Sequence, residues 1–229
     1  MANPNSPPAE LVTFLRRVPL FHDLDESALR IFARVAHLKN VPRHTFLFYQ
    51  DDEGDAAYVI RSGEIIILLT TTDGRELVIN TMHAGECLGE LALLTDAPRT
   101  ASAFAQQDTQ VIVLPRAEFL NELERQPKLM RHILELTAQR LRASTERERA
   151  LAFLDAPARL AGVLLELERA ASNVGFITLS QDALAQHIGV ARQTTAKILG
   201  QWRRAGWILT GRGKLVILDR AALRKIAQT

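Results

Sequence analysis

The 229-residue sequence predicts an α+β fold in which a β-rich barrel or sandwich precedes a long helix and a basic, mostly helical end. Three observations predict it. Apolar residues alternate with polar ones in short, glycine-punctuated runs between residues 41 and 115, as in antiparallel sheets. From residue 127 to about 154 they recur every three or four residues without glycine. Residues 156–229 hold 11 Lys or Arg against 4 Asp or Glu, whereas residues 1–155 hold 17 against 22, and such a split is typical of a part that meets nucleic acid.

The composition excludes several classes of protein. With 47% hydrophobic and 24% charged residues, the chain resembles an ordinary globular protein, and no run approaches the roughly 18 apolar residues of a membrane span. Residues 1–10 lack the basic and apolar regions of a signal peptide, so we expect a frayed end. The single cysteine, Cys87, excludes intrachain disulfides and a four-cysteine iron–sulfur site, and we therefore expect a location in the reducing cytoplasm.

The elements follow in order from local periodicity. Residues 10–37 have helical spacing, and Asp25 offers capping chemistry before the second helix. Asp73-Gly74 between two apolar runs indicates a hairpin. We expect strands at residues 45–49, 58–61, 64–70, 77–82, 101–106 and 110–114.

Residues 89–101 hold the most informative chemistry. Gly89 and Glu90 open the run, Arg99 and Thr100 stand near its end, and the apolar stretch between them suits one helical turn whose free N–H groups face an anion. Arg99 offers a planar fork of donors for phosphate oxygens. Glu90 accepts only, which suits a sugar hydroxyl. Phosphate and sugar together indicate a nucleotide, and the alternative is an amphipathic turn with a surface Glu and Arg.

This run resembles the phosphate-binding cassette of cyclic-nucleotide-binding domains, Gly-Glu-(apolar)-Ala-Leu-(several)-Arg-(Ser/Thr/Ala)-Ala. The resemblance implies that Glu90 binds the ribose 2′-hydroxyl, that Arg99 binds the cyclic phosphate, and that Thr100 adds a donor. One departure lies at residues 50–53, where the family commonly has a glycine, and it leaves the local turn open. The expected binding residues in the run are Gly89, Glu90, Leu91, Ala92, Arg99 and Thr100.

The long helix carries a stripe of residues at coiled-coil spacing, here called the seam: Met130, Leu134, Thr137, Leu141, Ser144, Glu148 and Leu151. Its polar members need partners, which a polar ligand beside the seam would supply. The helix resembles the dimer helix of the cAMP receptor protein/fumarate–nitrate reduction regulator family. That implies adenine contacts from Ser144 and Thr145, one hydroxyl from each subunit, and a bracing contact from Arg140 to Glu90. It also implies a hinge at Phe153, Leu154 and Asp155. The alternative for Ser144-Thr145 is an exposed pair of hydroxyls.

Residues 178–199 have the rhythm of a helix–turn–helix, with Ser180 as a cap and Gly189 in the turn. Arg192, Gln193 and Lys197 share one face of the second helix, where Arg and Lys favour guanine and Gln favours adenine. Thr194 suits a phosphate contact, and Arg212 and Lys214 are two cations at the tip of an expected hairpin. We therefore expect DNA contacts from Ser180, Arg192, Gln193, Thr194, Lys197, Arg212 and Lys214.

The same family resemblance covers residues 11–227 and implies an N-terminal antiparallel β-roll (jelly-roll-like) with flanking helices, a long dimerisation helix and a winged helix–turn–helix. The expected domains are residues 1–126, 127–155 and 156–229. It further implies a cytoplasmic bacterial homodimer that binds a palindromic double-stranded operator and contacts RNA polymerase. The allosteric ligand it implies is cAMP, with cGMP as a second candidate because of Thr100. Cyclic di-GMP, redox or no signal are the alternatives. The family's commonest groove pattern is Arg-Glu-x-x-x-Arg, so Gln193 and Lys197 predict a different operator.

An enzyme acting on cyclic nucleotides is the remaining alternative. Hydrolysis normally requires a metal cluster or an activated nucleophile. The six histidines show no local ligand spacing such as His-Glu-x-x-His, and Cys87, with His83 four residues upstream, is expected to be a small buried hydrophobe. We therefore expect no catalytic residues and no metal.

Overall fold

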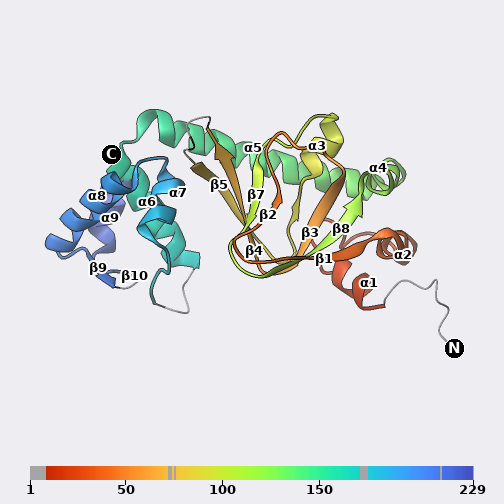
Figure 1. Cartoon of the computed structure of the whole chain (residues 1–229), viewed down its shortest axis with the longest axis horizontal. Helices are drawn as coiled ribbons and strands as arrows, with labels where there is room; N and C mark the ends of the chain where they lie inside the picture. Colours follow the sequence, from red (N-terminus) through yellow and green to blue (C-terminus); the bar gives the residue numbers. More distant parts are fainter. Residues whose placement is uncertain (1–8, 72–73, 75, 171–174, 212, 229) are drawn as a thin grey trace. The chain divides into compact units, whose positions relative to one another are not determined.

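The computed structural model describes residues 9–71, 74, 76–170, 175–211 and 213–228 and divides into two compact units (Figure 1). The first unit comprises residues 1–74 and 79–141, and the second comprises residues 75–78 and 142–229. The first is built on β-strands and the second is mostly helical, which confirms the α+β class. Among the described residues, no helix is long and apolar enough to cross a membrane.

The β-roll of the first unit consists of two four-stranded sheets, and the strand pairings among the described residues are antiparallel. Their strand orders are β1-β8-β3-β6 and β2-β7-β4-β5. The strands are β1 (His37–Val41), β2 (Phe46–Phe48), β3 (Ala56–Ser62), β4 (Glu64–Thr70), β5 (Glu76–His83), β6 (Cys87–Leu88), β7 (Ser102–Ala105) and β8 (Thr109–Pro115). All six expected strands are present. The sequence reading missed β1, an edge strand with four exposed residues in five, and the two-residue β6.

The interior strand β3 is buried on both of its faces. Ala57 and Val59 join the core that the helices complete, whereas Tyr58 and Ile60 join the core between the two sheets. Successive strand residues point to opposite faces, so one strand serves both cores. The resulting run of five buried residues at the start of β3 lacks the alternation of a half-exposed strand.

The helices of the first unit are α1 (Ala9–Leu15), α2 (Glu26–Val35), α3 (Glu90–Thr95), α4 (Arg116–Arg125) and the first half of α5 (Pro127–Phe153). Phe21, Phe32 and Phe119 are fully buried. The ring centroids of Phe32 and Phe119 lie 6.4 Å apart and join α2 to α4, and Phe21, in the turn before α2, lies 5.1 Å from Phe32. Because α4 directly follows the last strand, the sequence reading assigned no separate helix there.

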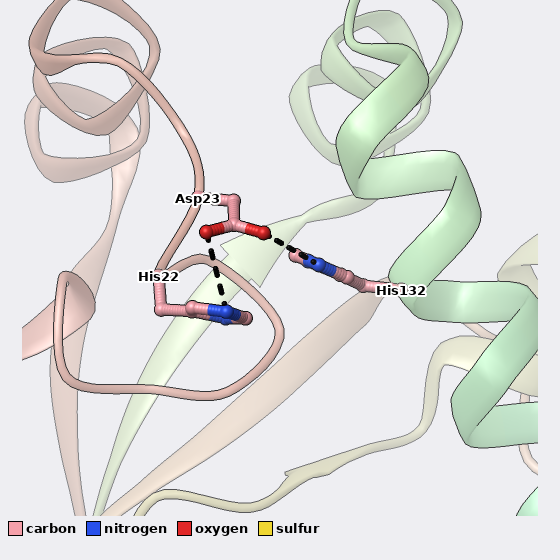
Figure 2. A group of neighbouring side chains, drawn as sticks. All are labelled: His22, Asp23 and His132. Carbon is pink, nitrogen blue, oxygen red and sulfur yellow. Dashed lines mark ion pairs between the residues drawn. The ribbon is translucent and has the colours of Figure 1, made fainter.

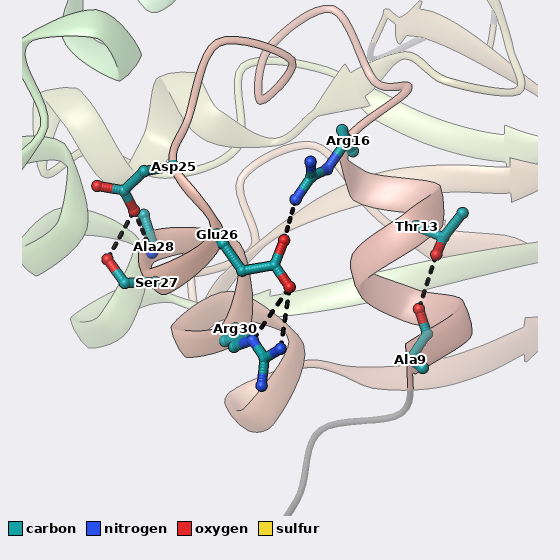
Figure 3. A network of polar contacts seen from close by, with 8 residues as sticks. All are labelled: Ala9, Thr13, Arg16, Asp25, Glu26, Ser27, Ala28 and Arg30. Atoms are coloured by element: carbon teal, nitrogen blue, oxygen red, sulfur yellow. Dashed lines mark hydrogen bonds and ion pairs between the residues drawn. The ribbon is translucent and has the colours of Figure 1, made fainter.

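The start of α2 is fixed by local polar contacts (Figure 3). Asp25 caps the helix by accepting from the Ala28 N–H at 2.8 Å, as expected, and it also accepts from the Ser27 hydroxyl. The Ser27 hydroxyl is the main cause that lowers the pKa of Asp25, followed by the Ala28 N–H. Glu26 accepts from Arg16 and from Arg30, which ties the end of α1 to the first turn of α2.

Strands β4 and β5, which precede and follow the hairpin expected at Asp73-Gly74, are neighbours in one sheet. The hairpin residues Thr72, Asp73 and Arg75 lie outside the described residues, as do residues 1–8 at the expected frayed end. The cassette helix α3 lies between β6 and β7, so each sheet contributes one strand that leads into or out of it.

The second unit contains the remainder of α5, then α6 (Ala156–Ala170), α7 (Gln181–Ile188), α8 (Arg192–Arg204), the hairpin β9 (Ile208–Gly211) and β10 (Lys214–Ile217), and α9 (Arg220–Ala227). Leu164, Ile188, Trp202 and Leu223 lie in its core, one from each of α6 to α9. The order of two helices, a strand pair and a closing helix is that of the expected winged helix–turn–helix.

Candidate cyclic-nucleotide site and DNA-reading helix

Gly89 sets the geometry of the cassette. It precedes α3 with φ of +80°, a conformation that side chains rarely adopt. A Cβ built on Gly89 would lie 2.6 Å from Nη1 of Arg99 and 3.3 Å from the Tyr58 ring. Only glycine therefore allows the backbone turn and the nearby arginine together, which explains the first letter of the motif.

Arg99 is buried, with 2% of its surface exposed, and its terminal nitrogens donate within the protein. Nη1 donates to the Gly89 carbonyl at 2.7 Å, and Nη2 donates to the Ala56 carbonyl at 2.8 Å and to Asp55 at 3.0 Å. Its backbone is held as well, because its N–H donates to the Asp52 carbonyl. The guanidinium is thus fixed beside the start of α3.

Two aromatic rings, which the sequence reading did not find, complete the surroundings of Arg99. The guanidinium carbon lies 4.4 Å from the centre of the Phe48 ring and 5.4 Å from that of Tyr58, both within cation–π range. Tyr58 also donates to Asp55 at 3.3 Å, and burial together with the Asp55 charge raises the pKa of Tyr58. Phe48 lies on β2 and Tyr58 on β3, so no local spacing connects either ring to Arg99.

Glu90 is fully buried at the first position of α3. Arg140 of α5 donates one terminal nitrogen to Glu90 Oε1 and the other to the Cys87 carbonyl. Burial raises the pKa of Glu90, while the charges of Arg140 and Arg99 pull it back down. A buried carboxylate facing two arginines is the acceptor that a sugar hydroxyl would meet.

Two buried polar atoms of the cassette have no hydrogen-bond partner among the described residues: Arg99 Nε, a donor, and Glu90 Oε2, an acceptor. Buried polar groups normally find partners because an unmatched group costs about 1–3 kcal/mol. A phosphate oxygen is an acceptor for the first atom, and a ribose hydroxyl is a donor for the second. The residues present therefore fit a nucleotide in kind.

The rest of the cassette differs in exposure. Leu91 is half-buried, Ala92 is buried and Thr100 is exposed. Ala92 lies so near Gly54 that a Cβ there would approach its methyl group to 2.7 Å. In the loop where the family commonly has glycine, Asp51 adopts φ of +68°, the backbone conformation that glycine favours.

Ser144 and Thr145 belong to the second unit. Ser144 is half-buried and donates to Glu148 at 3.3 Å, and Thr145 is exposed. Their approach to a base stays a prediction.

Of the expected hinge residues, Phe153 is 81% exposed, Leu154 is half-buried and Asp155 accepts from the Ala158 N–H at 2.8 Å. The chain therefore leaves α5 at Phe153 and enters α6 under an aspartate cap.

The reading helix α8 has one buried face and one exposed face. Thr195, Ile198, Leu199 and Trp202 are buried. The four expected DNA-contacting residues are exposed in the first two turns: Arg192, Gln193, Thr194 and Lys197. Helix α7 starts under the expected Ser180 cap, which accepts from the Ala183 N–H at 3.0 Å, and Gly189 ends it with φ of +66°.

The β9–β10 hairpin forms the wing of the winged helix–turn–helix and includes Lys214, which is exposed. Nζ of Lys214 lies 4.2 Å from the centre of the Phe176 ring. Arg212 lies outside the described residues. On α8, Arg192 faces Asp182 of α7 at 3.5 Å, with both side chains more than half exposed. Such a contact is weak in water and leaves Arg192 accessible to a DNA base.

Cys87 is buried, and burial raises the pKa of its thiol far above the ordinary range. The thiolate that a nucleophile needs is therefore disfavoured. His83 is instead exposed, with its ring 3.6 Å from Glu64.

Comparisons with known proteins agree with this geometry. Residues 38–126 match the cyclic nucleotide-binding domain, and residues 158–226 match the Crp-like helix-turn-helix domain. The cyclic AMP receptor protein of Thermus thermophilus is 31% identical over 209 residues, which cover 91% of this chain and 96% of the relative. A CRP-like cAMP-activated global transcriptional regulator of Mycobacterium tuberculosis is 28% identical over 220 residues, 93% and 98% of the two chains.

Among solved structures, the c-di-GMP-responsive global regulator CLP of Xanthomonas campestris has a TM-score of 0.78 at 22% identity, covering 85% of this chain and all of that one. At this identity the likeness confirms the fold. The cassette, the reading helix and the match to the Thermus relative over 91% of this chain lead to one conclusion. The chain belongs to the cAMP receptor protein/fumarate–nitrate reduction regulator family, as a transcription regulator that responds to a cyclic nucleotide.

Proposed function

We propose that the chain acts as a cytoplasmic homodimer that binds cAMP as its allosteric ligand and then binds a palindromic DNA operator. The observation that carries the proposal is the pair of buried, unmatched atoms in the cassette, Arg99 Nε and Glu90 Oε2. One is a donor on a fixed cation, and the other is an acceptor on a braced carboxylate. A cyclic phosphate and its ribose provide the complementary groups.

The assignment of cAMP rests on the base contacts and on the relatives. Ser144 and Thr145 would bind the adenine, one hydroxyl from each subunit, and two relatives are named for cAMP. Thr100, exposed next to Arg99, would also suit the amino group of guanine, so we expect weaker binding of cGMP.

Dimerisation is supported by apolar side chains that α5 exposes along the seam. Met130, Leu134, Leu141 and Leu151 are 38%, 63%, 67% and 40% exposed. A second copy of α5 would bury them, at roughly 25 cal/mol per Å² of apolar surface. Two copies would place their reading helices about one DNA turn, roughly 34 Å, apart on a palindrome.

In this proposal the hinge at Phe153, Leu154 and Asp155 allows the DNA-binding domain two orientations, one of which is able to bind DNA. The nucleotide shifts the equilibrium between these orientations only as far as its affinities for the two differ. Regulation then includes contacts with RNA polymerase, as the family membership implies. DNA affinity should fall steeply with salt because the reader is cationic.

Calorimetric titration of the dimeric protein with cAMP, cGMP and cyclic di-GMP tests the ligand assignment. We expect one cAMP per chain, weaker cGMP and no saturable binding of cyclic di-GMP. Tight binding of cyclic di-GMP without cAMP binding would overturn the assignment and favour the signal of the Xanthomonas regulator.

Replacing Gln193 by glutamate should change which operator is preferred and not merely weaken binding. Glutamine pairs with adenine, whereas glutamate accepts from the cytosine amino group, and each good base contact discriminates by about 1–3 kcal/mol. Selection from a randomised operator pool measures the preference. Gln201→Glu, with the same charge change near the far end of α8, should leave the selected sequence unchanged. An identical selection profile for Gln193→Glu and the parent would exclude base reading by this residue.

A further inference from the structure

Three side chains with metal-binding atoms meet in the first unit, away from the cassette (Figure 2). His22 and Asp23 lie in the turn between α1 and α2, and His132 lies on α5. Nε2 of each histidine is 3.3 Å from a different oxygen of Asp23. The three ligand atoms lie within 4.8 Å of one another, and this is the one such group among the described residues.

The orientation of both imidazole rings is fixed by the backbone. Nδ1 of His22 is 2.6 Å from the Pro19 carbonyl, and Nδ1 of His132 is 3.1 Å from the Leu20 carbonyl. A carbonyl only accepts, so each Nδ1 carries the hydrogen and donates it. The remaining nitrogen, Nε2, is then the one that faces Asp23. A metal-binding histidine is commonly oriented in this way, with its second nitrogen donating to a backbone carbonyl.

A cation between the three side chains would suit this arrangement. With a hydrogen on each Nδ1, the Nε2 lone pairs face carboxylate lone pairs at 3.3 Å, acceptor against acceptor. The two rings are stacked, with centroids 4.8 Å apart and 15° between their planes. A single divalent cation would accept a lone pair from each of the three side chains.

We propose that His22, Asp23 and His132 form a site for a divalent transition metal of the zinc type. Two imidazole nitrogens and one carboxylate oxygen are a ligand set that zinc accepts, with water in the fourth position. Ligand distances of about 2.0–2.2 Å around a tetrahedral ion place neighbouring ligand atoms about 3.3 Å apart. Each Nε2 already lies at this distance from one oxygen of Asp23, Oδ1 for His22 and Oδ2 for His132.

The exposure of the three side chains and the charge of a nearby lysine also affect how well an ion can bind. The His132 side chain is only 11% exposed, whereas those of His22 and Asp23 are about half exposed, so an ion can enter from solvent. Lys128 donates to the Asp23 carbonyl at 3.3 Å, and its positive charge opposes the ion. Bound metal would tie the turn before α2 to α5, the helix that carries Arg140. The proposed site departs from the expectation of no metal. The sequence did not predict it because His22 and His132 lie far apart in the chain and form no local ligand motif.

Titration of tag-free, chelator-treated protein with zinc chloride near pH 7.5, about one unit above the ordinary pKa of histidine, tests the site. We expect one zinc per chain by calorimetry and a thermal unfolding midpoint raised by about 5 °C. His22→Gln and Asp23→Asn should each weaken binding about tenfold or more. Because both side chains are half exposed, these variants avoid the folding risk of changing the more buried His132.

His83→Gln is the matched control, since its exposed ring also faces a carboxylate but forms no three-residue group. It should bind zinc as the parent does. The titration contains no nucleotide, so its outcome is separate from that of the cAMP proposal. Absence of saturable binding, or parental affinity in both His22→Gln and Asp23→Asn, would overturn the zinc site. Nitrogen NMR showing both Nε2 atoms protonated in zinc-treated protein would also overturn it, in favour of a histidine pair charged by protons.

Discussion

Replacing Arg99 by leucine is expected to abolish cAMP binding, with at least a hundredfold loss of affinity. Arg99 is the cation beside Gly89 and holds an unmatched buried donor, and hydrogen bonds to charged groups contribute about 1.5–3 kcal/mol each. The substitution would remove more than one such hydrogen bond between Arg99 and the phosphate. Calorimetric titration with cAMP measures the loss, and persistent micromolar binding would contradict the role of Arg99.

Arg99→Leu should also lower the free energy of unfolding, an effect that the sequence alone does not indicate. Leucine would leave the Gly89 and Ala56 carbonyls without the donors that Arg99 supplies. Each unmatched buried carbonyl costs about 1–3 kcal/mol. Arg116→Leu is the matched control, because Arg116 pairs with Asp96 at the end of α3 and its side chain is one-third exposed. That variant should keep both cAMP binding and nearly all of the stability.

Replacing Arg140 by leucine is expected to destabilise the first unit by about 3–5 kcal/mol near pH 8, because it leaves buried Glu90 without its closest cation. The loss should be smaller near pH 5. Burial raises the pKa of Glu90 and Arg140 opposes that rise, so removing Arg140 raises the pKa further. A carboxyl group with a raised pKa in the folded state favours folding at low pH. This contribution is lost as pH rises through the folded-state value.

Denaturant unfolding of the parent and of Arg140→Leu across pH 5 to 8 measures this difference. Arg142→Leu, on the exposed side of the same helix, should show no such pH dependence. A parent–variant difference that stays constant with pH would show that Arg140 does not stabilise the Glu90 charge.

Much of the fold could be predicted because its signals are local. The periodicity of β4 and the capping residues Asp25 and Ser180 each depend on a few consecutive residues. The edge strand β1 was missed because its four exposed residues, Leu38 among them, carry no alternation, although its pairing with β8 holds it in the sheet. Residues 50–53 lack the glycine, and only the structure indicates that Asp51 takes its conformation.

The candidate site also has a part that the sequence predicts and a part that only the fold brings together. Gly89, Glu90 and Arg99 stand in one short run, so their chemistry can be read together. Phe48 on β2 and Asp55 just before β3 contact Arg99, which lies in the loop between α3 and β7, and no sequence spacing indicates that these segments meet. The group of His22, Asp23 and His132 was missed for the same reason, since it joins a turn near the N-terminus to α5.

In the proposed function, nucleotide held by Arg99 and Glu90 controls the DNA-reading helix. Fluorescence anisotropy of a labelled operator, chosen by selection, tests it with and without saturating cAMP. We predict that cAMP raises operator affinity of the parent protein about 5- to 150-fold, the usual range of coupling between sites, and leaves that of Arg99→Leu unchanged. Equal operator affinity with and without cAMP, in a parent protein that calorimetry shows to be cAMP-bound, would contradict the account.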